Sequence, residues 1–292
     1  MTLALTTYAL GDRVLHGAAG QDAGPAFVFL HGVTRRWQTF LPLVPALMPR
    51  WRLHLVDQRG HGVSPRAPDA GYRVVDYVGD VVSLICENLP TPVVLYGHSL
   101  GAMVAAAVAA EIPSKIRAIV LEDPPFHTMG ARIAQTPWQG YFQSVRPLAG
   151  SDRPVQEIAR QLADVQMTDP NTGQSQRLGD TRDPAALLFA AQCLRQLDPR
   201  VLDPVIAGAW LDGYEPAAIF PRIQCPTLVL QADPAAGGAL TTADAELMER
   251  SIPHCTAIRF EQSNHTLHWP RAQQVAHLVL NFVESLDEES LG

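Results

Sequence analysis

One stretch of this sequence limits the possible folds more than any other. Over residues 92–105 an apolar segment leads through a glycine turn into an alanine-rich segment. The turn, residues 97–101, reads Gly-His-Ser-Leu-Gly. β-Branched residues before it and helix-forming residues after it predict a buried strand that passes through a strained turn directly into a helix. The flanking glycines let the strand and the helix pack closely, which lifts the hydroxyl of Ser99 clear of the backbone.

This turn also combines two groups that acyl-transfer chemistry needs. Ser99 stands at the nucleophile position of the G-x-S-x-G pattern. The next amide, that of Leu100, lies at the predicted helix N-terminus, where unpaired N–H groups and the helix dipole favour negative charge. We therefore expect one turn to supply a nucleophile and half of an oxyanion hole.

Short apolar runs alternate with amphipathic segments on both sides of the turn. A strand pair is predicted within residues 5–16. Further buried strands are predicted at residues 26–30, 52–56, 116–121, 225–233 and 256–260, and helices at 72–89, 242–251 and 270–286. This alternation predicts an α/β fold with a doubly wound, mostly parallel sheet.

The alternation stops between the predicted strand at 116–121 and the one at 225–233. Residues 126–221 show no strong strand pattern and are rich in proline, glutamine, arginine and aromatic residues. Helical patches are predicted near 154–167 and 184–197, and a polar loop at 173–179. We predict a core domain formed by residues 1–125 and 222–292, with residues 126–221 as a helical insertion over the sheet.

The composition fits a globular protein that acts on small molecules. Of the 292 residues 47% are hydrophobic and 17% are charged, so the chain can bury a sizeable core. The net charge of −7 comes without a basic cluster, and no apolar run is long enough to cross a bilayer, so neither nucleic acid nor a membrane is an expected partner. Four scattered cysteines and the absence of a signal-peptide pattern are typical of a cytoplasmic protein. Metal-ligand and phosphate-loop motifs are missing, so we expect no metal and no cofactor.

Four motifs in a fixed order carry a family resemblance. His31-Gly32 follows an early strand, the segment 57–64 reads Asp-x-Arg-Gly-x-Gly-x-Ser, the glycine turn at 97–101 comes next, and Asn264-His265 stands late in the chain. In this order of parts the chain resembles the α/β-hydrolase superfamily over nearly its whole length. The resemblance implies the α/β-hydrolase fold, with residues 126–221 in the place of a helical cap domain. It also implies that the segment 57–64 is structural.

The resemblance assigns roles to two residues of a catalytic triad. Ser99 is the expected nucleophile, and it needs a general base within hydrogen-bond reach. His265 is expected to be that base, because it lies in the loop where the family places its histidine. His268, three residues further on, is the rival histidine and could instead line the site or stack with Trp269.

The acid of the triad has two candidates in this sequence. Asp123 stands at the C-terminal end of a predicted strand, where catalytic groups gather in parallel sheets. Asp233 follows the next predicted core strand, two places before the slot that many relatives use, which holds Ala235 here. We favour Asp123 and keep Asp233 as the alternative, with Glu122 expected to point the opposite way from Asp123.

The remaining expectations concern the oxyanion hole and the pocket. The resemblance pairs the amide of Leu100 with that of Val33, which follows His31-Gly32. The residues expected near the substrate are His31, Trp37, His98, Phe126, Trp138, Tyr141 and Trp210. For any single one of the five tryptophan, phenylalanine and tyrosine residues, packing in the core is the more common role.

Together these residues predict a serine hydrolase that cleaves a carboxylic ester or lactone of a small apolar molecule. One alternative keeps the triad and hydrolyses a carbon–carbon bond, or works as a cofactor-free perhydrolase. Another is a ligand-binding protein on a hydrolase scaffold without turnover. Ser99 argues against dehalogenase or epoxide hydrolase chemistry, because the related enzymes of those kinds carry aspartate at this position.

Overall fold

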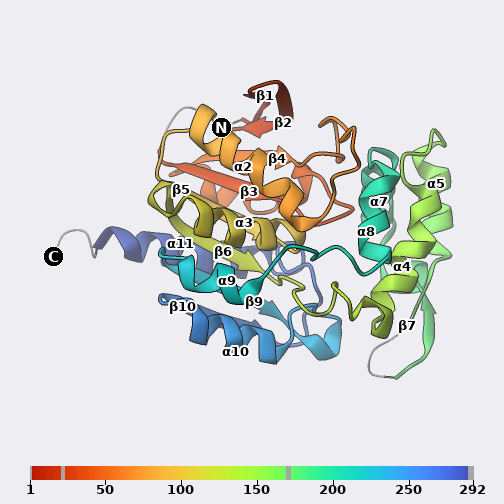
Figure 1. The fold of residues 1–292 in the computed structure, drawn as a ribbon. Helices are drawn as coiled ribbons and strands as arrows, with labels where there is room; N and C mark the ends of the chain where they lie inside the picture. Colours follow the sequence, from red (N-terminus) through yellow and green to blue (C-terminus); the bar gives the residue numbers. More distant parts are fainter. Residues whose placement is uncertain (1, 21–23, 169–171, 289–292) are drawn as a thin grey trace.

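The computed structural model describes residues 2–20, 24–168 and 172–288. In this part of the chain the main sheet has eight strands in the order β1-β2-β4-β3-β5-β6-β9-β10 (Figure 1). Their bounds are β1 Ala4–Leu10, β2 Arg13–Ala19, β3 Ala26–Leu30, β4 Arg52–Asp57, β5 Val93–His98, β6 Ile116–Glu122, β9 Thr227–Ala232 and β10 Cys255–Phe260. The strands β1 and β2 run antiparallel to their neighbours, and the other pairs are parallel. The predicted doubly wound, mostly parallel sheet is confirmed.

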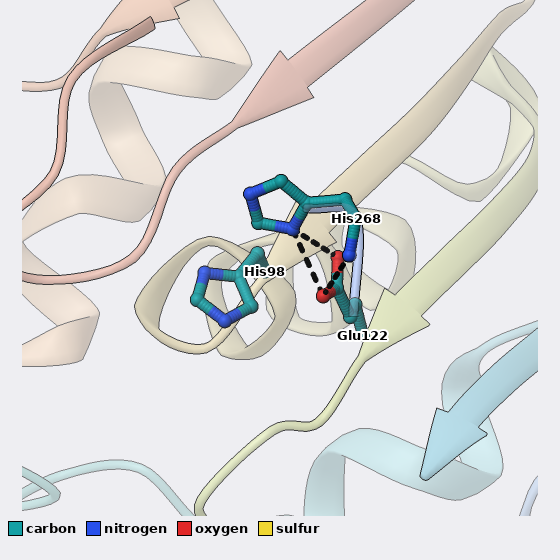
Figure 2. Close-up of side chains that lie close together, drawn as sticks. All are labelled: His98, Glu122 and His268. Carbon is teal, nitrogen blue, oxygen red and sulfur yellow. Dashed lines mark hydrogen bonds and ion pairs between the residues drawn. The ribbon is translucent and has the colours of Figure 1, made fainter. Parts of the chain in front are cut away.

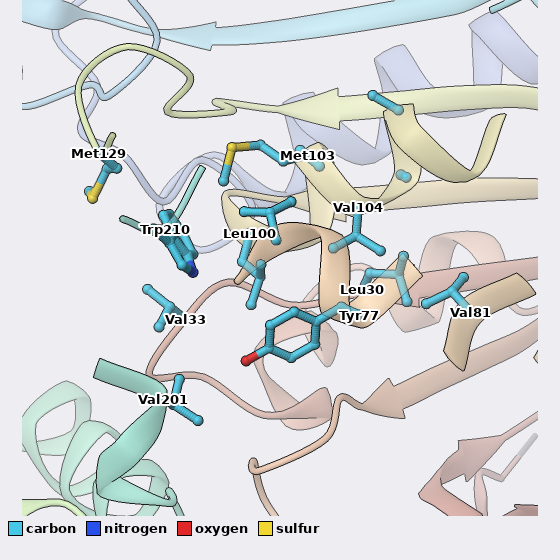
Figure 3. Packing of buried hydrophobic residues seen from close by; sticks show 14 of the residues in the cluster. Leu30, Val33, Tyr77, Val81, Leu100, Met103, Val104, Met129, Val201 and Trp210 are labelled. Atoms are coloured by element: carbon cyan, nitrogen blue, oxygen red, sulfur yellow. The ribbon is translucent and has the colours of Figure 1, made fainter. Parts of the chain in front are cut away.

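Helices cover both faces of the sheet, which explains why its central strands are continuous apolar runs. Along β3, Val28 and Leu30 belong to one buried cluster, and Phe27 and Phe29 belong to the other. The first cluster includes side chains of α2 (Val74–Asn88), α3 (Leu100–Glu111) and α10 (Thr242–Ser251). The second includes side chains of α1 (Val44–Leu47) and α11 (Ala272–Glu288). Figure 3 shows part of the first cluster, with labelled side chains from β3, α2 and α3.

The segment between β6 and β9 contributes a group of helices that stands beside the sheet (Figure 1). It contains α4 Pro137–Val145, α5 Val155–Ala163, α6 Leu178–Thr181, α7 Pro184–Arg195 and α8 Leu202–Ile206. We refer to these five helices as the cap helices. After them α9 (Pro216–Ile219) returns to pack near α3. The boundaries of a separate cap domain at 126 and 221 stay a prediction.

The sequence-based prediction was wrong for one part of this segment. Residues predicted as a polar loop at 173–179 include β8 (Ser175–Arg177), which pairs antiparallel with β7 (Gln166–Thr168). Each strand is three residues long, and no residue of either strand is buried. Such short, exposed strands carry no apolar alternation that a sequence could reveal.

The segment 57–64 forms the structural turn that the sequence resemblance implied. The Asp57 carboxylate accepts hydrogen bonds from the amides of Trp37 (2.8 Å) and Val63 (3.1 Å), and Ser64 Oγ donates to the Asp57 carbonyl (2.5 Å). Burial raises the pKa of Asp57 to about 6 against the effect of these amides. The side chain of Arg59 extends from the turn and forms an ion pair with Asp80 of α2. The turn therefore fixes the end of β4 against neighbouring loops.

Among the described helices, none combines the length and the apolar character needed to cross a membrane.

Candidate active site

The elbow between β5 and α3 holds Ser99 in a strained conformation. Its φ is 55° and its ψ is −115°, a backbone region that costs free energy for any residue other than glycine. The glycines on either side permit this turn. A Cβ on Gly97 would lie 2.2 Å from the carbonyl oxygen of Gly101, and a Cβ on Gly101 would lie 1.9 Å from that of Leu30. The close packing expected from the sequence is thus present on both sides of the serine.

Hydrogen-bond donors and acceptors around Ser99 are left unused. Its buried Oγ has no hydrogen-bond partner among the described residues. Within the same part of the chain, the amides of Val33 and Leu100 donate to no acceptor. The loop after β3 passes close to the serine, because a Cβ on Gly32 would lie 3.0 Å from Ser99 Cβ. Two free amides near a free hydroxyl are what an oxyanion hole and its nucleophile require.

The structure joins His265 to Asp123. The distance from His265 Nδ1 to Asp123 Oδ2 is 2.6 Å. Asp123 directly follows β6 with a φ of 47°, and its fully buried carboxylate accepts hydrogen bonds from the amides of Ala232 (3.1 Å), Ala239 (2.7 Å) and Leu240 (3.2 Å). Because these amides and the imidazole are donors, the carboxylate is held as an acceptor. Nδ1 of His265 then carries the proton, which leaves Nε2 as a base.

Asp233, the other candidate acid, is engaged elsewhere. Its Oδ1 lies 3.0 Å from Arg259 Nη2, and its carboxylate accepts hydrogen bonds from the amides of Gln262 and Ala235, each at 3.0 Å. These amides and the guanidinium keep the pKa of Asp233 below its ordinary value. The structure therefore brings Asp123 to His265 and leaves Asp233 to fix the turn after β9.

The rival histidine, His268, is bound to Glu122 beneath the site (Figure 2). Glu122 accepts hydrogen bonds from His268 Nδ1 (2.7 Å), the Leu267 amide (2.6 Å) and Tyr96 Oη (2.5 Å). Burial alone would raise the pKa of Glu122, but the charge of His268 and these hydrogen bonds outweigh it and lower that pKa to about 2. His268 therefore anchors the loop that carries His265.

His98 supports His265 from a third side. Its Nε2 donates to the His265 carbonyl (2.9 Å), and burial lowers its pKa well below the ordinary range, so the ring is neutral. Ligand atoms of His98, Glu122 and His268 lie within 4.8 Å of one another, close enough to hold a metal ion. Both Glu122 oxygens already accept hydrogen bonds from N–H or O–H groups, so this cluster does not fit a cation.

A cavity of about 430 Å³ opens over the elbow. Ser99 and His265 line it together with Val33 and His98 from the sheet side. Cap helix α4 supplies further walls, and the ring of Trp138 lies 5.5 Å from that of His265 in a T-shaped arrangement. The serine, the imidazole and the cap aromatics thus share one cavity of a size suited to a small molecule.

Comparisons with known proteins agree with this architecture. Residues 25–272 match the family model described as alpha/beta hydrolase fold. The chain belongs to that family. It is 30% identical over 254 residues to the pimeloyl-[acyl-carrier protein] methyl ester esterase of Chromobacterium violaceum, which covers 83% of this chain and 87% of the relative.

Two further proteins are similar to this alpha/beta hydrolase. The 2-(acetamidomethylene)succinate hydrolase of Mesorhizobium japonicum is 37% identical over 111 residues, which span 38% of this chain and only 40% of the relative. The solved structure of an enol-lactonase from Burkholderia xenovorans superposes with a TM-score of 0.74 at 20% identity, over 96% of this chain and 100% of that one. This last likeness concerns the fold alone.

Of the predicted pocket residues, His98, Trp138 and Tyr141 line the cavity of this alpha/beta hydrolase. The prediction was wrong for His31, which is fully buried behind the oxyanion loop. Its Nε2 accepts from the Gln58 amide (3.1 Å), so Nδ1 donates to the Gly32 carbonyl (2.9 Å). His31 shapes the loop and does not reach the cavity.

The other three aromatic residues do not line the cavity and take the alternative role, packing in the core. Trp37 packs against the second buried cluster, beside α1 and α11. Phe126 lies against Phe220, with ring centroids 5.1 Å apart, and Trp210 is fully buried in the first cluster. Phe126 and Trp210 are almost completely buried and Trp37 is partly buried, so all three pack against the core and do not line the cavity.

Sequence reasoning missed two charged residues of the cavity, Arg35 and Arg182. Arg35 stands only two places after Val33, so its closeness to the oxyanion loop could have been inferred from spacing. Arg182 had no such signal, because it reaches the site only through the folding of the cap helices.

Proposed function

We propose that this chain is a serine hydrolase that cleaves a carboxylic ester or lactone of a small molecule, with Ser99 as nucleophile, His265 as base and Asp123 as acid. One observation carries the proposal: His265 is hydrogen-bonded to a buried carboxylate and shares a cavity with a serine in a strained elbow. The name of one similar protein, a methyl ester esterase, supports this reaction class.

The proposed reaction proceeds in two balanced steps. Ser99 Oγ attacks the substrate carbonyl while its proton passes to His265 Nε2, and the amides of Val33 and Leu100 stabilise the oxyanion. The carbon–oxygen bond of the ester then breaks, and His265 returns the proton to the departing alcohol. Water attacks the acyl group with His265 again as base, which releases the acid and restores the Ser99 hydroxyl.

Asp123 contributes by orienting the imidazole of His265 and by stabilising its positive charge. Its carboxylate keeps His265 in the tautomer that leaves Nε2 free and offsets the positive charge that forms on the ring. The three amides that bind Asp123 fix that carboxylate in place.

Labelling with a fluorophosphonate tests the proposal. Intact mass and peptide mapping should find one adduct per chain, located on Ser99, because only an activated serine reacts with this probe. Ser99→Ala should abolish the adduct and lower ester turnover by roughly three or more orders of magnitude. Ser114→Ala, which changes an exposed serine, is the matched control and should label as the parent protein does.

The outcomes separate the three candidate functions. Labelling of Ser99 with turnover of an ester or lactone panel supports the proposal. Labelling with turnover only of a diketone ring-fission product would point to carbon–carbon hydrolysis instead. A protein that binds small esters but neither labels nor turns over would be a binding protein on a hydrolase scaffold.

A further inference from the structure

Two guanidinium groups line the cavity that contains Ser99 and His265. Arg35 comes from the loop after β3, and Arg182 directly follows α6 among the cap helices. Both side chains are partly buried. Among the described residues, neither guanidinium makes a hydrogen bond or an ion pair. Their charges also act on each other, because burial and the charge of Arg35 lower the pKa of Arg182.

Several arginines elsewhere in the structure pair with carboxylates. Ion pairs join Arg59 to Asp80, Arg200 to Asp198, Arg259 to Asp233 and Arg146 to Asp203. The chain carries 29 acidic residues against 22 basic ones, so acids are not in short supply. Two arginines brought together without a carboxylate leave a local excess of positive charge, which costs free energy unless an anion binds there.

The neighbouring arginine, Arg36, has partners outside the cavity. Arg36 Nη1 donates to Gln196 Oε1 (2.6 Å), and its guanidinium lies 5.8 Å from the ring centroid of Phe189. Arg36 does not line the cavity. In this loop Arg36 therefore contacts the cap segment, whereas Arg35 lines the cavity.

The acidic group next to the pair serves another purpose. Asp183 lines a second hollow, which Arg35 and Arg182 also border. Its Oδ1 accepts a hydrogen bond from the Ala186 amide (2.9 Å) and caps α7. In the part of the chain that is described, it forms no ion pair with either arginine, so it leaves both cations unneutralised.

We propose that Arg35 and Arg182 bind a carboxylate of the substrate, so that the preferred ester or lactone carries an anionic group at the end away from the scissile carbonyl. The guanidinium fork matches the planar carboxylate and can bind it with two parallel hydrogen bonds. Apolar walls from Met129, Phe142 and Leu178 would hold the carbon chain between the two ends. This inference rests on the proposed hydrolase function, and it replaces the purely apolar substrate expected from the sequence.

A pair of esters matched in length tests the inference. One is the mono(4-nitrophenyl) ester of a linear six-carbon dicarboxylic acid; the other is the 4-nitrophenyl ester of a linear seven-carbon monocarboxylic acid. We expect kcat/KM to be at least about tenfold higher for the anionic ester, since a charge-assisted contact is worth more than an apolar one here. Arg35→Met and Arg182→Met should each remove most of that preference, mainly by raising KM for the anionic ester.

Controls separate this inference from the proposed function. Arg195→Met removes an exposed arginine of α7 and should keep the full preference. Calorimetric titration of Ser99→Ala with the six-carbon dicarboxylate should show binding that Arg182→Met abolishes, whether or not turnover occurs. Cleavage of both esters at equal rates would overturn the inference and leave the hydrolase function standing. Competition by inorganic phosphate in place of carboxylates would also overturn it.

Discussion

The position of the Asp123 carboxylate in the site depends on the conformation of the backbone at Asp123 and on the backbone amides around it. Its left-handed φ of 47° turns the chain at the end of β6, where the carboxylate accepts hydrogen bonds from the last amide of β9 and from two amides of the segment that follows β9. Its neighbour Glu122 lies one residue earlier and binds a different set of donors. Two adjacent carboxylates therefore serve two purposes, because the turn between them separates their side chains.

Replacing Asp123 by asparagine should cripple turnover and spare the fold. The amide would keep the size of the side chain but would place a donor against donors and lose the negative charge that supports His265. We expect kcat to fall by about 10⁴-fold, the order expected when a triad carboxylate becomes an amide. Steady-state kinetics with a 4-nitrophenyl ester, together with a circular dichroism spectrum, checks this outcome.

Asp233→Asn is the matched control for this change. Asp233 pairs with Arg259 and does not contact His265, so its variant should retain turnover within about twofold. A large loss in Asp233→Asn with a small one in Asp123→Asn would reverse the assignment of the acid.

At the scale of elements, the packing of α3 against β3 and β5 determines whether the elbow can form. The helix begins directly at the elbow, and Gly101 in its first turn touches the backbone of β3. No side chain fits at this contact. The strain at Ser99 is therefore maintained by rigid elements on both sides of it.

Gly101→Ala should destabilise the protein strongly. The added Cβ would lie 1.9 Å from the Leu30 carbonyl oxygen, so α3 or β3 would have to move. We expect a loss of about 3 kcal/mol or more in the free energy of unfolding, measured by urea denaturation.

For a second glycine, on the neighbouring helix α2, we expect substitution by alanine to stabilise the protein. Gly79 is exposed on α2, and no heavy atom lies within 4 Å of a Cβ added there. Gly79→Ala should stabilise the protein by about 0.5–1 kcal/mol, because alanine loses less conformational entropy in a helix. If both variants were equally unstable, close packing would not be the reason for glycine at position 101.

At the scale of the whole molecule, the Glu122–His268 pair couples stability to pH. The pKa of Glu122 lies at about 2, below its ordinary value of 4.5. A depressed acid pKa contributes stability that is fully present above 4.5 and is lost as the pH falls toward 2. The contribution is about 3 kcal/mol at neutral pH, from the size of that shift.

Glu122→Gln should flatten this part of the stability curve. Denaturant unfolding between pH 5 and pH 2 should show a weaker pH dependence than the parent protein, and the variant should be less stable at pH 7 by about 3 kcal/mol because His268 loses its buried partner. Glu246→Gln, which alters an exposed ion pair with Arg250, should follow the parent curve. An unchanged slope in Glu122→Gln would mean that other carboxyl groups account for the acid sensitivity.

Much of this molecule could be read from the sequence because its strong patterns are local. The apolar runs and the 97–101 turn predicted the sheet, the elbow and the position of Ser99. The aromatic lining was harder, because Phe126 and Trp210 are equally suited to a core and to a pocket. The sequence favours Asp123 over Asp233 as the partner of His265 only through its place at a strand end, because the contact depends on the left-handed turn at Asp123 and on amides that lie far along the chain.

The two cavity arginines have different origins, and this has a mechanical consequence. Arg35 belongs to the sheet layer, whereas Arg182 is carried by the cap helices. An anion bound to both arginines would connect the cap helices to the sheet layer from inside the cavity. Binding of substrate would then hold the cap helices more rigidly against the sheet layer, and release of product would loosen them again.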